Sequence, residues 1–139
     1  MQVLAQWKLA GAPVEGVPAG LAASCARVGH DLLAEPVRLP GLRWWAGREG
    51  TLPGILVGLR TDEGTRFGSR VVPDDDVPAM TVGLAEAVQD HLAGYEFIQW
   101  PSCPGHRHPM RPSVEPDNAW WTCPASRRKV SVIGQLPPA

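Results

Sequence analysis

Cysteines and histidines in metal-binding spacing constrain the fold of this chain more than any other feature of its sequence. Cys103 and His106 flank Pro104-Gly105, and Cys123 is followed by another proline. A Cys-Pro-Gly-His turn directs the sulfur and the imidazole toward one centre and leaves backbone N–H groups free to donate to the thiolate. A separate module of fewer than about 40 residues usually needs a metal or disulfides to be stable. We therefore expect residues 97–139 to form a metal-stapled module.

Short extended segments surround these turns. Residues 110–114 and 119–122 are joined by Glu-Pro-Asp-Asn, a strong turn sequence, and residues 129–136 supply a third apolar strand. Alternating turns and strands of this length are typical of a zinc ribbon. The predicted C-terminal module is therefore three-stranded and zinc-ribbon-like.

The spacing leaves the fourth ligand open. A complete ribbon has a ligand two to four residues after its second cysteine, and this chain has Ala125, Ser126 and Arg127 there. His108 is the available substitute. Side chains two residues apart on an extended strand lie about 7 Å apart, so His106 and His108 can converge only if the backbone bends. The following proline favours such a bend.

We favour a structural Zn²⁺ ion. The favoured ligands are Cys103, His106, His108 and Cys123. Two alternatives stay open: three protein ligands plus water, as in catalytic zinc sites, and cysteines that remain thiols or form a disulfide. Copper or iron also suit such ligands.

The tail resembles that of uncharacterised small actinobacterial proteins with the pattern WPxCPxHxHP…WWxCP. The match covers Trp100-Pro101, Cys103-Pro104, His106, His108-Pro109, Trp120-Trp121, Cys123-Pro124 and Gly134-x-Leu136. The resemblance implies metal binding and supplies no reaction. Relatives carry a histidine or cysteine shortly after the second Cys-Pro, whereas this chain has Ser126-Arg127-Arg128.

Residues 1–96 predict a separate small α+β domain, with two helices on a small antiparallel sheet. Residues 1–17 read as an edge strand or a loosely held arm. Apolar residues on one helical stripe predict a helix over 18–34, where they are Leu21, Cys25, Val28 and Leu32. His30 lies off this stripe and is expected in solvent.

A β-hairpin and a second helix follow. Two β-rich runs flank Asp62-Glu63-Gly64, and Gly58 and Gly68 within them indicate a bulge or a close backbone approach. The second helix is expected over 78–93, with Leu84, Val88 and Leu92 buried. We interpret Asp74-Asp75-Asp76 as its N-terminal cap, in preference to a divalent-cation site.

Adjacent tryptophans and a basic run suggest a ligand surface. If one ring of each pair is exposed, the rings could form a stacking platform, although a core ring plus a covering ring is the favoured interpretation. Arg107 and Arg111 extend the basic run. The residues of this possible surface are Trp44, Trp45, Trp120, Trp121, Arg127 and Arg128.

No enzyme motif is present in the sequence: it contains no nucleophile elbow, P-loop, dinucleotide fingerprint or H-E-x-x-H. Whether the protein is an enzyme is left open by the sequence. With a catalytic metal, Glu96, Glu115 and His91 would be the nearest candidate bases.

The expected function is therefore that of a small zinc-binding accessory or binding protein with an unknown protein or small-molecule partner. The alternatives are a small metalloenzyme of a bacterial biosynthetic pathway, with an open coordination position, and a nucleic-acid-binding ribbon. The latter is not favoured because the net charge is −1. The odd cysteine count and the lack of a leader or of a long apolar segment indicate a cytoplasmic protein without a membrane partner.

Overall fold

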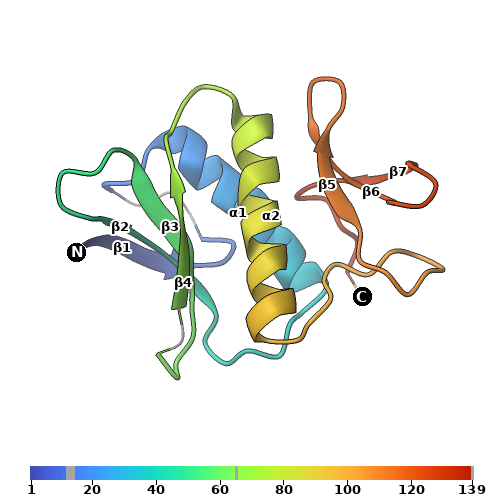
Figure 1. Ribbon diagram of the computed structural model, residues 1–139, viewed down its shortest axis with the longest axis horizontal. Coiled ribbons are helices and arrows are strands. Elements are labelled where there is room, and N and C mark those ends of the chain that lie inside the picture. The colour runs from blue at the N-terminus through green and yellow to red at the C-terminus, as the bar shows by residue number, and fades with distance from the viewer. Residues whose placement is uncertain (12–14, 65, 139) are drawn as a thin grey trace.

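Two helices lie between two antiparallel sheets in the computed structural model, which describes residues 1–11, 15–64 and 66–138. In Figure 1 a four-stranded sheet is on the left, the helices cross the middle, and a three-stranded sheet is on the right. The predicted α+β class is confirmed. The helices pack against the four-stranded sheet on one side and against the three-stranded sheet on the other.

The N-terminal sheet has the strand order β1-β2-β3-β4, and all its neighbours pair antiparallel. Its strands are β1 (Gln2–Lys8), β2 (Arg43–Arg48), β3 (Ile55–Arg60) and β4 (Arg66–Val71). β1 is an edge strand, as predicted, and the predicted hairpin is confirmed as β3 and β4. Residues 12–14 of the predicted arm and Thr65 of the hairpin connection lie outside the described residues.

The two glycines of the hairpin mark a close approach. Gly58 and Gly68 pair directly with no register shift, so the predicted alternative of a bulge is wrong. A Cβ atom on Gly68 would lie 2.7 Å from the ring of Trp45. Nε1 of Trp45 donates to the Phe67 carbonyl at 2.9 Å. The missing side chain of Gly68 therefore leaves room for the Trp45 indole, and that of Gly58 lets the β3 and β4 backbones approach closely.

The predicted helices form as α1 (Ala19–Ala34) and α2 (Val77–Tyr95). The four stripe residues of α1 are buried, and His30 is exposed, as predicted. Asp76 caps α2 by accepting from the Ala79 N–H at 3.0 Å, which confirms the capping interpretation. α2 continues past the predicted end at residue 93, because the Glu96 N–H bonds to the Leu92 carbonyl and closes one more turn.

The C-terminal sheet has the order β5-β6-β7, which are β5 (Arg111–Val114), β6 (Ala119–Thr122) and β7 (Lys129–Val132). The predicted Glu-Pro-Asp-Asn turn joins the first two strands, where the Glu115 N–H donates to the Asn118 carbonyl. β7 is shorter than the predicted strand 129–136. The chain turns at Gly134, whose φ of 104° favours glycine, and this turn ends the strand.

A buried carboxylate joins the C-terminal sheet to α1. Oδ2 of Asp31 accepts from Nε1 of Trp121 at 2.7 Å and from the Gly134 N–H at 2.8 Å. Oδ1 accepts from the Leu136 N–H at 3.1 Å. Asp31 is 0% exposed. Three N–H groups of the C-terminal segment are therefore satisfied by one side chain of the first helix.

Tryptophan rings fill the seam between the helices and the C-terminal sheet. Trp100 and Trp121 meet edge to face, with their ring centroids 5.3 Å apart. Nε1 of Trp100 donates to the Glu35 carbonyl at 3.0 Å. Buried residues of both predicted parts, 1–96 and 97–139, belong to one hydrophobic cluster. The boundary stays a prediction, but both parts share this core.

Neither α1 nor α2, the helices of the described chain, has the length and apolar character that crossing a membrane requires.

Candidate metal centre

A closed loop presents the first three predicted ligands. The Cys103 N–H donates to the His108 carbonyl at 3.2 Å, and a bridge between Ser102 and Pro109 closes the loop beneath it. The His106 N–H donates back to the Cys103 carbonyl at 3.1 Å. The segment is thus a turn and not an extended strand. The bend that the sequence required for both histidines to converge is present.

A second turn presents Cys123 from the opposite side. It follows β6, and the Cys123 N–H donates to the Arg128 carbonyl at 2.9 Å. The Arg127 N–H returns a bond to the Cys123 carbonyl at 2.8 Å, with Arg127 at a φ of 61°. The Ser126 N–H points at the Cys123 sulfur at 3.5 Å. Ser126 occupies the window where a ribbon ligand was missing, and its backbone supports the thiolate.

The four predicted ligand atoms converge on one centre. Those of Cys103, His106, His108 and Cys123 all lie within 4.8 Å of one another. Nδ1 of His106 lies 3.3 Å from the Cys103 sulfur and 3.5 Å from the Cys123 sulfur. Nε2 of His108 lies 3.6 Å from the Cys123 sulfur.

These distances fit a tetrahedral metal. Zn–S bonds of about 2.3 Å and Zn–N bonds of about 2.1 Å at the tetrahedral angle place sulfur and nitrogen about 3.6 Å apart. The three sulfur–nitrogen distances given above fall between 3.3 and 3.6 Å. The donor set of two sulfurs and two nitrogens also suits a borderline-soft ion. The cluster can therefore hold a metal ion.

The cysteines and the histidines differ in exposure. Both cysteines are buried, whereas His106 is exposed and His108 half-buried. Hydrogen bonds from the side chain and backbone of Ser126 lower the pKa of Cys123 to about 5. Burial, followed by the neighbouring Cys123, raises the pKa of Cys103. One sulfur is thus a preformed thiolate, and the other would release its proton when a cation binds.

Three of the four tryptophans of the possible stacking platform are buried. Trp44, Trp45 and Trp121 are 0%, 4% and 0% exposed. Nε1 of Trp44 donates to the Leu9 carbonyl at 2.9 Å in the core. Adjacent strand residues do face opposite sides, but the Trp45 ring packs against Gly68 and under the guanidinium of Arg66, 5.1 Å from its centroid. Trp120 alone of the four is half-buried, with the ammonium of Lys129 5.1 Å from its ring centroid.

The candidate bases lie elsewhere. His91 is stacked between Phe67 and Tyr95, with centroids 4.1 and 5.2 Å away, and Glu96 lies beside it. Glu115 lies in the turn between β5 and β6. None of these three belongs to the cluster of metal-binding groups found among the described residues. Arg127 and Arg128 are exposed next to Cys123, as predicted for a solvated basic run.

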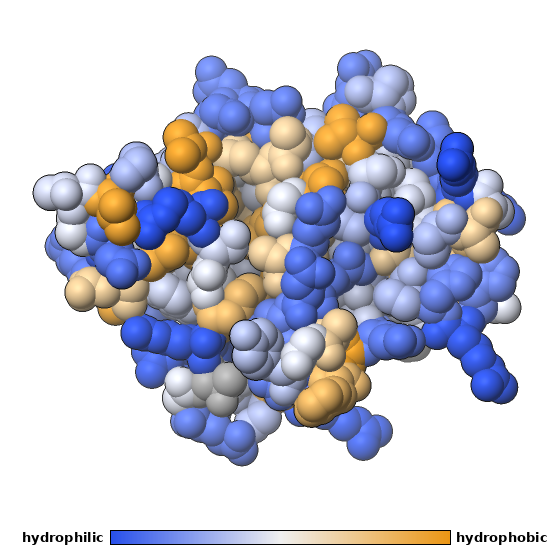
Figure 2. All heavy atoms as spheres, viewed as in Figure 1, coloured by the Kyte–Doolittle hydropathy of each residue, from blue (hydrophilic) through white to orange (hydrophobic). Residues whose placement is uncertain are grey.

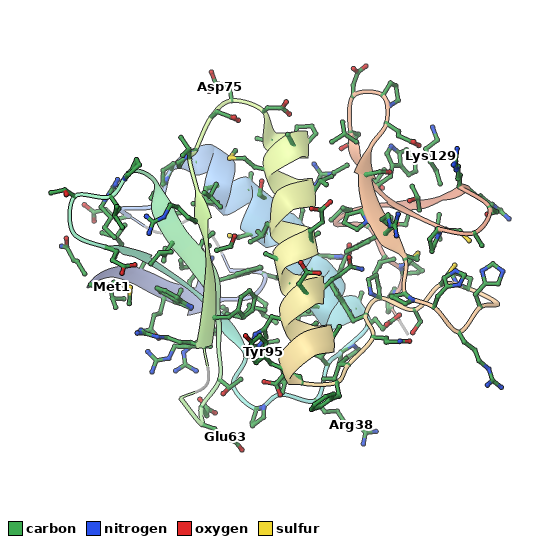
Figure 3. The ribbon with its side chains drawn as sticks, in the orientation of Figure 1. Met1, Arg38, Glu63, Asp75, Tyr95 and Lys129 are labelled. Atoms are coloured by element: carbon green, nitrogen blue, oxygen red, sulfur yellow. The ribbon has the colours of Figure 1, made fainter. Side chains whose placement is uncertain are left out.

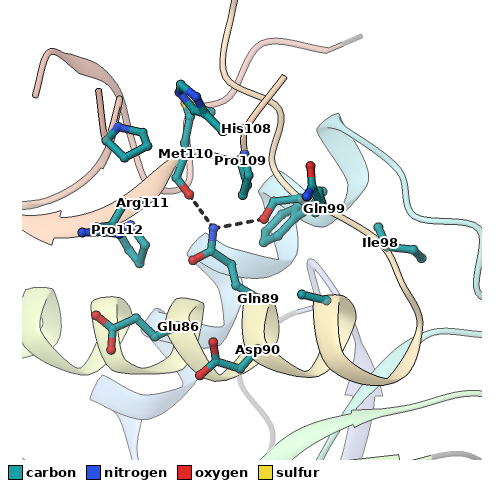
Figure 4. A pocket seen from close by; sticks show the side chains of 13 residues that line it. Glu86, Gln89, Asp90, Ile98, Gln99, His108, Pro109, Met110, Arg111 and Pro112 are labelled. Carbon is teal, nitrogen blue, oxygen red and sulfur yellow. Dashed lines mark hydrogen bonds between the residues drawn. The ribbon is translucent and has the colours of Figure 1, made fainter. Parts of the chain in front are cut away.

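A groove of about 630 Å³ separates α2 from the loop that carries Cys103, His106 and His108 (Figure 4). His108 and Pro109 line one wall, and Glu86 and Asp90 of α2 line the other. Nε2 of Gln89 crosses the groove to the carbonyls of Trp100 and Met110, at 3.0 and 2.6 Å. One carboxamide thus fixes the loop to the helix.

The sequence analysis did not identify the residues that join the helices to the C-terminal segment. They are Arg27, Asp31, Glu35, Gln89 and Trp100. Asp31 gave a weak signal, because it lies three residues after Val28 of the apolar stripe and hence on the buried side of the predicted helix. Nothing in the sequence indicated what it would bind.

Comparison of the chain with protein-family models, with curated proteins and with solved structures finds no match.

Proposed function

We propose that this protein is a small zinc-binding accessory or binding protein whose C-terminal sheet is a zinc ribbon stapled by Cys103, His106, His108 and Cys123. The observation that carries the proposal is the convergence of four soft and borderline donors from two facing turns within 4.8 Å. Four protein ligands are the mark of a structural zinc site.

The short strands and exposed turns of the C-terminal sheet also support a bound metal. β5, β6 and β7 each contain four residues, and a sheet of strands this short offers little surface for packing. The turns on both sides of the cluster carry exposed residues, among them His106, Arg107, Arg127 and Arg128. A bound ion would fix these turns relative to each other, where apolar contacts are lacking.

The test is the metal content of purified protein and of single-cysteine variants. We expect one zinc per chain, retained in Cys25→Ala and lost in Cys103→Ala and in Cys123→Ala. Cys25 is the matched control because it is equally buried but lies in α1, away from the cluster. Wild-type protein that purifies folded, takes up no zinc and binds none on titration would refute the proposal.

A small metalloenzyme is the second candidate, and the groove that reaches His108 is the observation that favours it. It requires an open coordination position, with His108 turned away from three remaining ligands. Cobalt substitution separates the two candidates. A tetrahedral spectrum that added anions leave unchanged, and that His108→Ala alters, supports the closed site. A wild-type spectrum that shifts with anions supports the enzyme.

A further inference from the structure

The small net charge of the chain, −1, hides a strong asymmetry. Residues 97–139 contain five lysines and arginines against two carboxylates, a net charge of +3. The rest of the chain contains eight against twelve, a net charge of −4. The ion pairs among the described residues involve none of the five C-terminal lysine and arginine side chains. These five are Arg107, Arg111, Arg127, Arg128 and Lys129, and all are exposed.

Two of these cations border a pocket on the outer face of the C-terminal sheet. Arg111 and Arg127 line a hollow of about 200 Å³ together with Ser113 and Thr122. The strand register explains the grouping, because Arg111 pairs with Thr122 across β5 and β6 and the side chains of directly paired residues share one face of a sheet. Figure 2 shows hydrophilic side chains over this end of the molecule.

A hydroxyl without a partner lies in the same pocket. Oγ of Ser113 is buried and makes no hydrogen bond to any described residue. Buried polar atoms are nearly always satisfied, so an unsatisfied one in a pocket indicates water or a ligand. The hydroxyl of Thr122 is already engaged, since it donates to the Arg111 carbonyl at 2.9 Å. Ser113 is therefore the free hydrogen-bonding group of this pocket.

We propose that this pocket binds the phosphoryl group of a ligand, with Arg111 and Arg127 as its cationic contacts and Ser113 as a hydrogen-bond donor. Guanidinium groups bind phosphate oxygens with paired N–H donors, and a hydroxyl adds a third contact. A volume of about 200 Å³ holds a tetrahedral oxyanion with some of its water.

One carboxylate opposes the anion. Glu115 also lines the pocket, and its exposed side chain lowers the positive potential there. Neutralising it should therefore strengthen anion binding. If the pocket had a purely structural role, neutralising Glu115 would not raise the affinity for an anion.

The half-buried ring of Trp120 distinguishes two sources of the phosphoryl group. Trp120 pairs directly with Ser113 across the sheet, so its ring lies next to the pocket on the same face. A base stacked on this ring would add affinity for a single-stranded nucleic acid. Free phosphate or a small phosphate ester would gain nothing from the ring. Replacing Trp120 by leucine therefore separates the two sources.

The experiment titrates zinc-loaded protein with inorganic phosphate and, separately, with a single-stranded oligonucleotide of mixed sequence at low salt. Arg111→Gln and Arg127→Asn should each weaken binding roughly five- to tenfold, and each should lower the salt slope by about 0.7 for a single strand. Asparagine is used at position 127 because it tolerates the positive φ. Glu115→Gln should strengthen binding about two- to fivefold.

Arg38→Gln is the matched control, since it removes the same charge from an exposed arginine far from Lys129 and the C-terminal sheet (Figure 3). Its binding should equal that of the wild type. The proposal rests on the proposed zinc staple, because Cys123 also lines the pocket, so zinc content and tryptophan fluorescence are measured for every variant. Only variants that keep zinc are compared. If folded wild-type protein holds no zinc, the staple is refuted, and titration of that metal-free protein still tests the phosphoryl site.

The titrations distinguish a small phosphate ligand, a nucleic acid and the absence of a phosphoryl site. Phosphate binding that is insensitive to Trp120→Leu, with no extra affinity for the oligonucleotide, supports a small phosphate ligand. Oligonucleotide binding that Trp120→Leu weakens supports a nucleic acid. If zinc-loaded protein binds neither probe, or if Arg38→Gln weakens binding as much as Arg111→Gln, the phosphoryl site is refuted.

Discussion

Asp31 is the position where a single substitution should loosen the C-terminal sheet. Its buried carboxylate accepts hydrogen bonds from Trp121, Gly134 and Leu136, and Oδ1 also lies 2.9 Å from Nδ1 of the neighbouring His30. Asp31→Ala removes the acceptor and leaves three N–H donors buried. Hydrogen bonds to a charged group contribute about 1.5–3 kcal/mol each, and a buried unsatisfied donor costs about 1–3 kcal/mol. Because such terms are not additive, we expect a loss of about 3–5 kcal/mol in the free energy of unfolding.

Asp31→Asn gives a graded control from the same geometry. An amide oxygen in the place of Oδ2 keeps the bonds from Trp121 and Gly134, since both donors contact that atom. The amide nitrogen in the place of Oδ1 cannot accept from the Leu136 N–H. The bond from Leu136 and the charge that faces His30 are lost, so the expected cost is about 1.5–3 kcal/mol, smaller than that of alanine.

The assay is urea denaturation of zinc-saturated protein, followed by far-UV circular dichroism and by tryptophan fluorescence. Urea unfolding gives the free energy by linear extrapolation. The free energy of unfolding should be highest for the wild type, lower for Asp31→Asn and lowest for Asp31→Ala. Equal stability of the two variants, or an alanine cost below about 1 kcal/mol, would show that the carboxylate does not hold the tail.

Three further substitutions test the packing and the titration of the helices. Gly29→Ala should cost about 2–4 kcal/mol in a thermal or urea melt, because its Cβ would lie 1.8 Å from the Leu9 carbonyl oxygen; a neutral result would mean that α1 is not held that close to β1. Burial lowers the pKa of His91, and this effect exceeds the opposing effect of Glu96. As the pH falls, His91 is therefore protonated in the unfolded state before it is protonated in the folded state. Its contribution to the free energy of unfolding should be complete above pH 6.5, the ordinary histidine value, and should be lost as the pH drops toward the lower folded pKa. His91→Phe should flatten that part of the stability–pH curve at saturating zinc, and an unchanged slope would rule out His91 as its source. Asp76→Ala should cost about 1 kcal/mol by removing the cap on the Ala79 N–H, and Asp75→Ala, the control, should cost less than half of that.

Local patterns determined most of the elements. The apolar stripe at Leu21, Cys25, Val28 and Leu32 predicted α1, and all four side chains are buried. Turn residues predicted the β3–β4 hairpin and the turn between β5 and β6. These predictions succeeded because helix stripes, turns and caps depend on residues close together in the chain.

Candidate ligands could also be named from the sequence, because Cys-Pro-Gly-His and Cys-Pro are local turn signals. Their convergence could not be derived. His108 takes the place of the ligand missing after Cys123 because the loop folds back, with the Cys103 N–H donating to the His108 carbonyl. That bend is a tertiary result, since the loop is held against α2 by Gln89 and against α1 by Glu35.

The exposure of the tryptophans was decided by tertiary structure alone. Strand alternation allowed one exposed ring in each pair, although a core ring plus a covering ring was favoured, and Trp45 packs against Gly68 and is buried. Alternation reports which face a side chain points to, and only the packed sheet reports what covers that face. For the same physical reason the sequence determined which residues of this protein can bind a metal. The fold decided which of them meet, because a ligand cluster joins positions distant in the chain that only the packed core brings together.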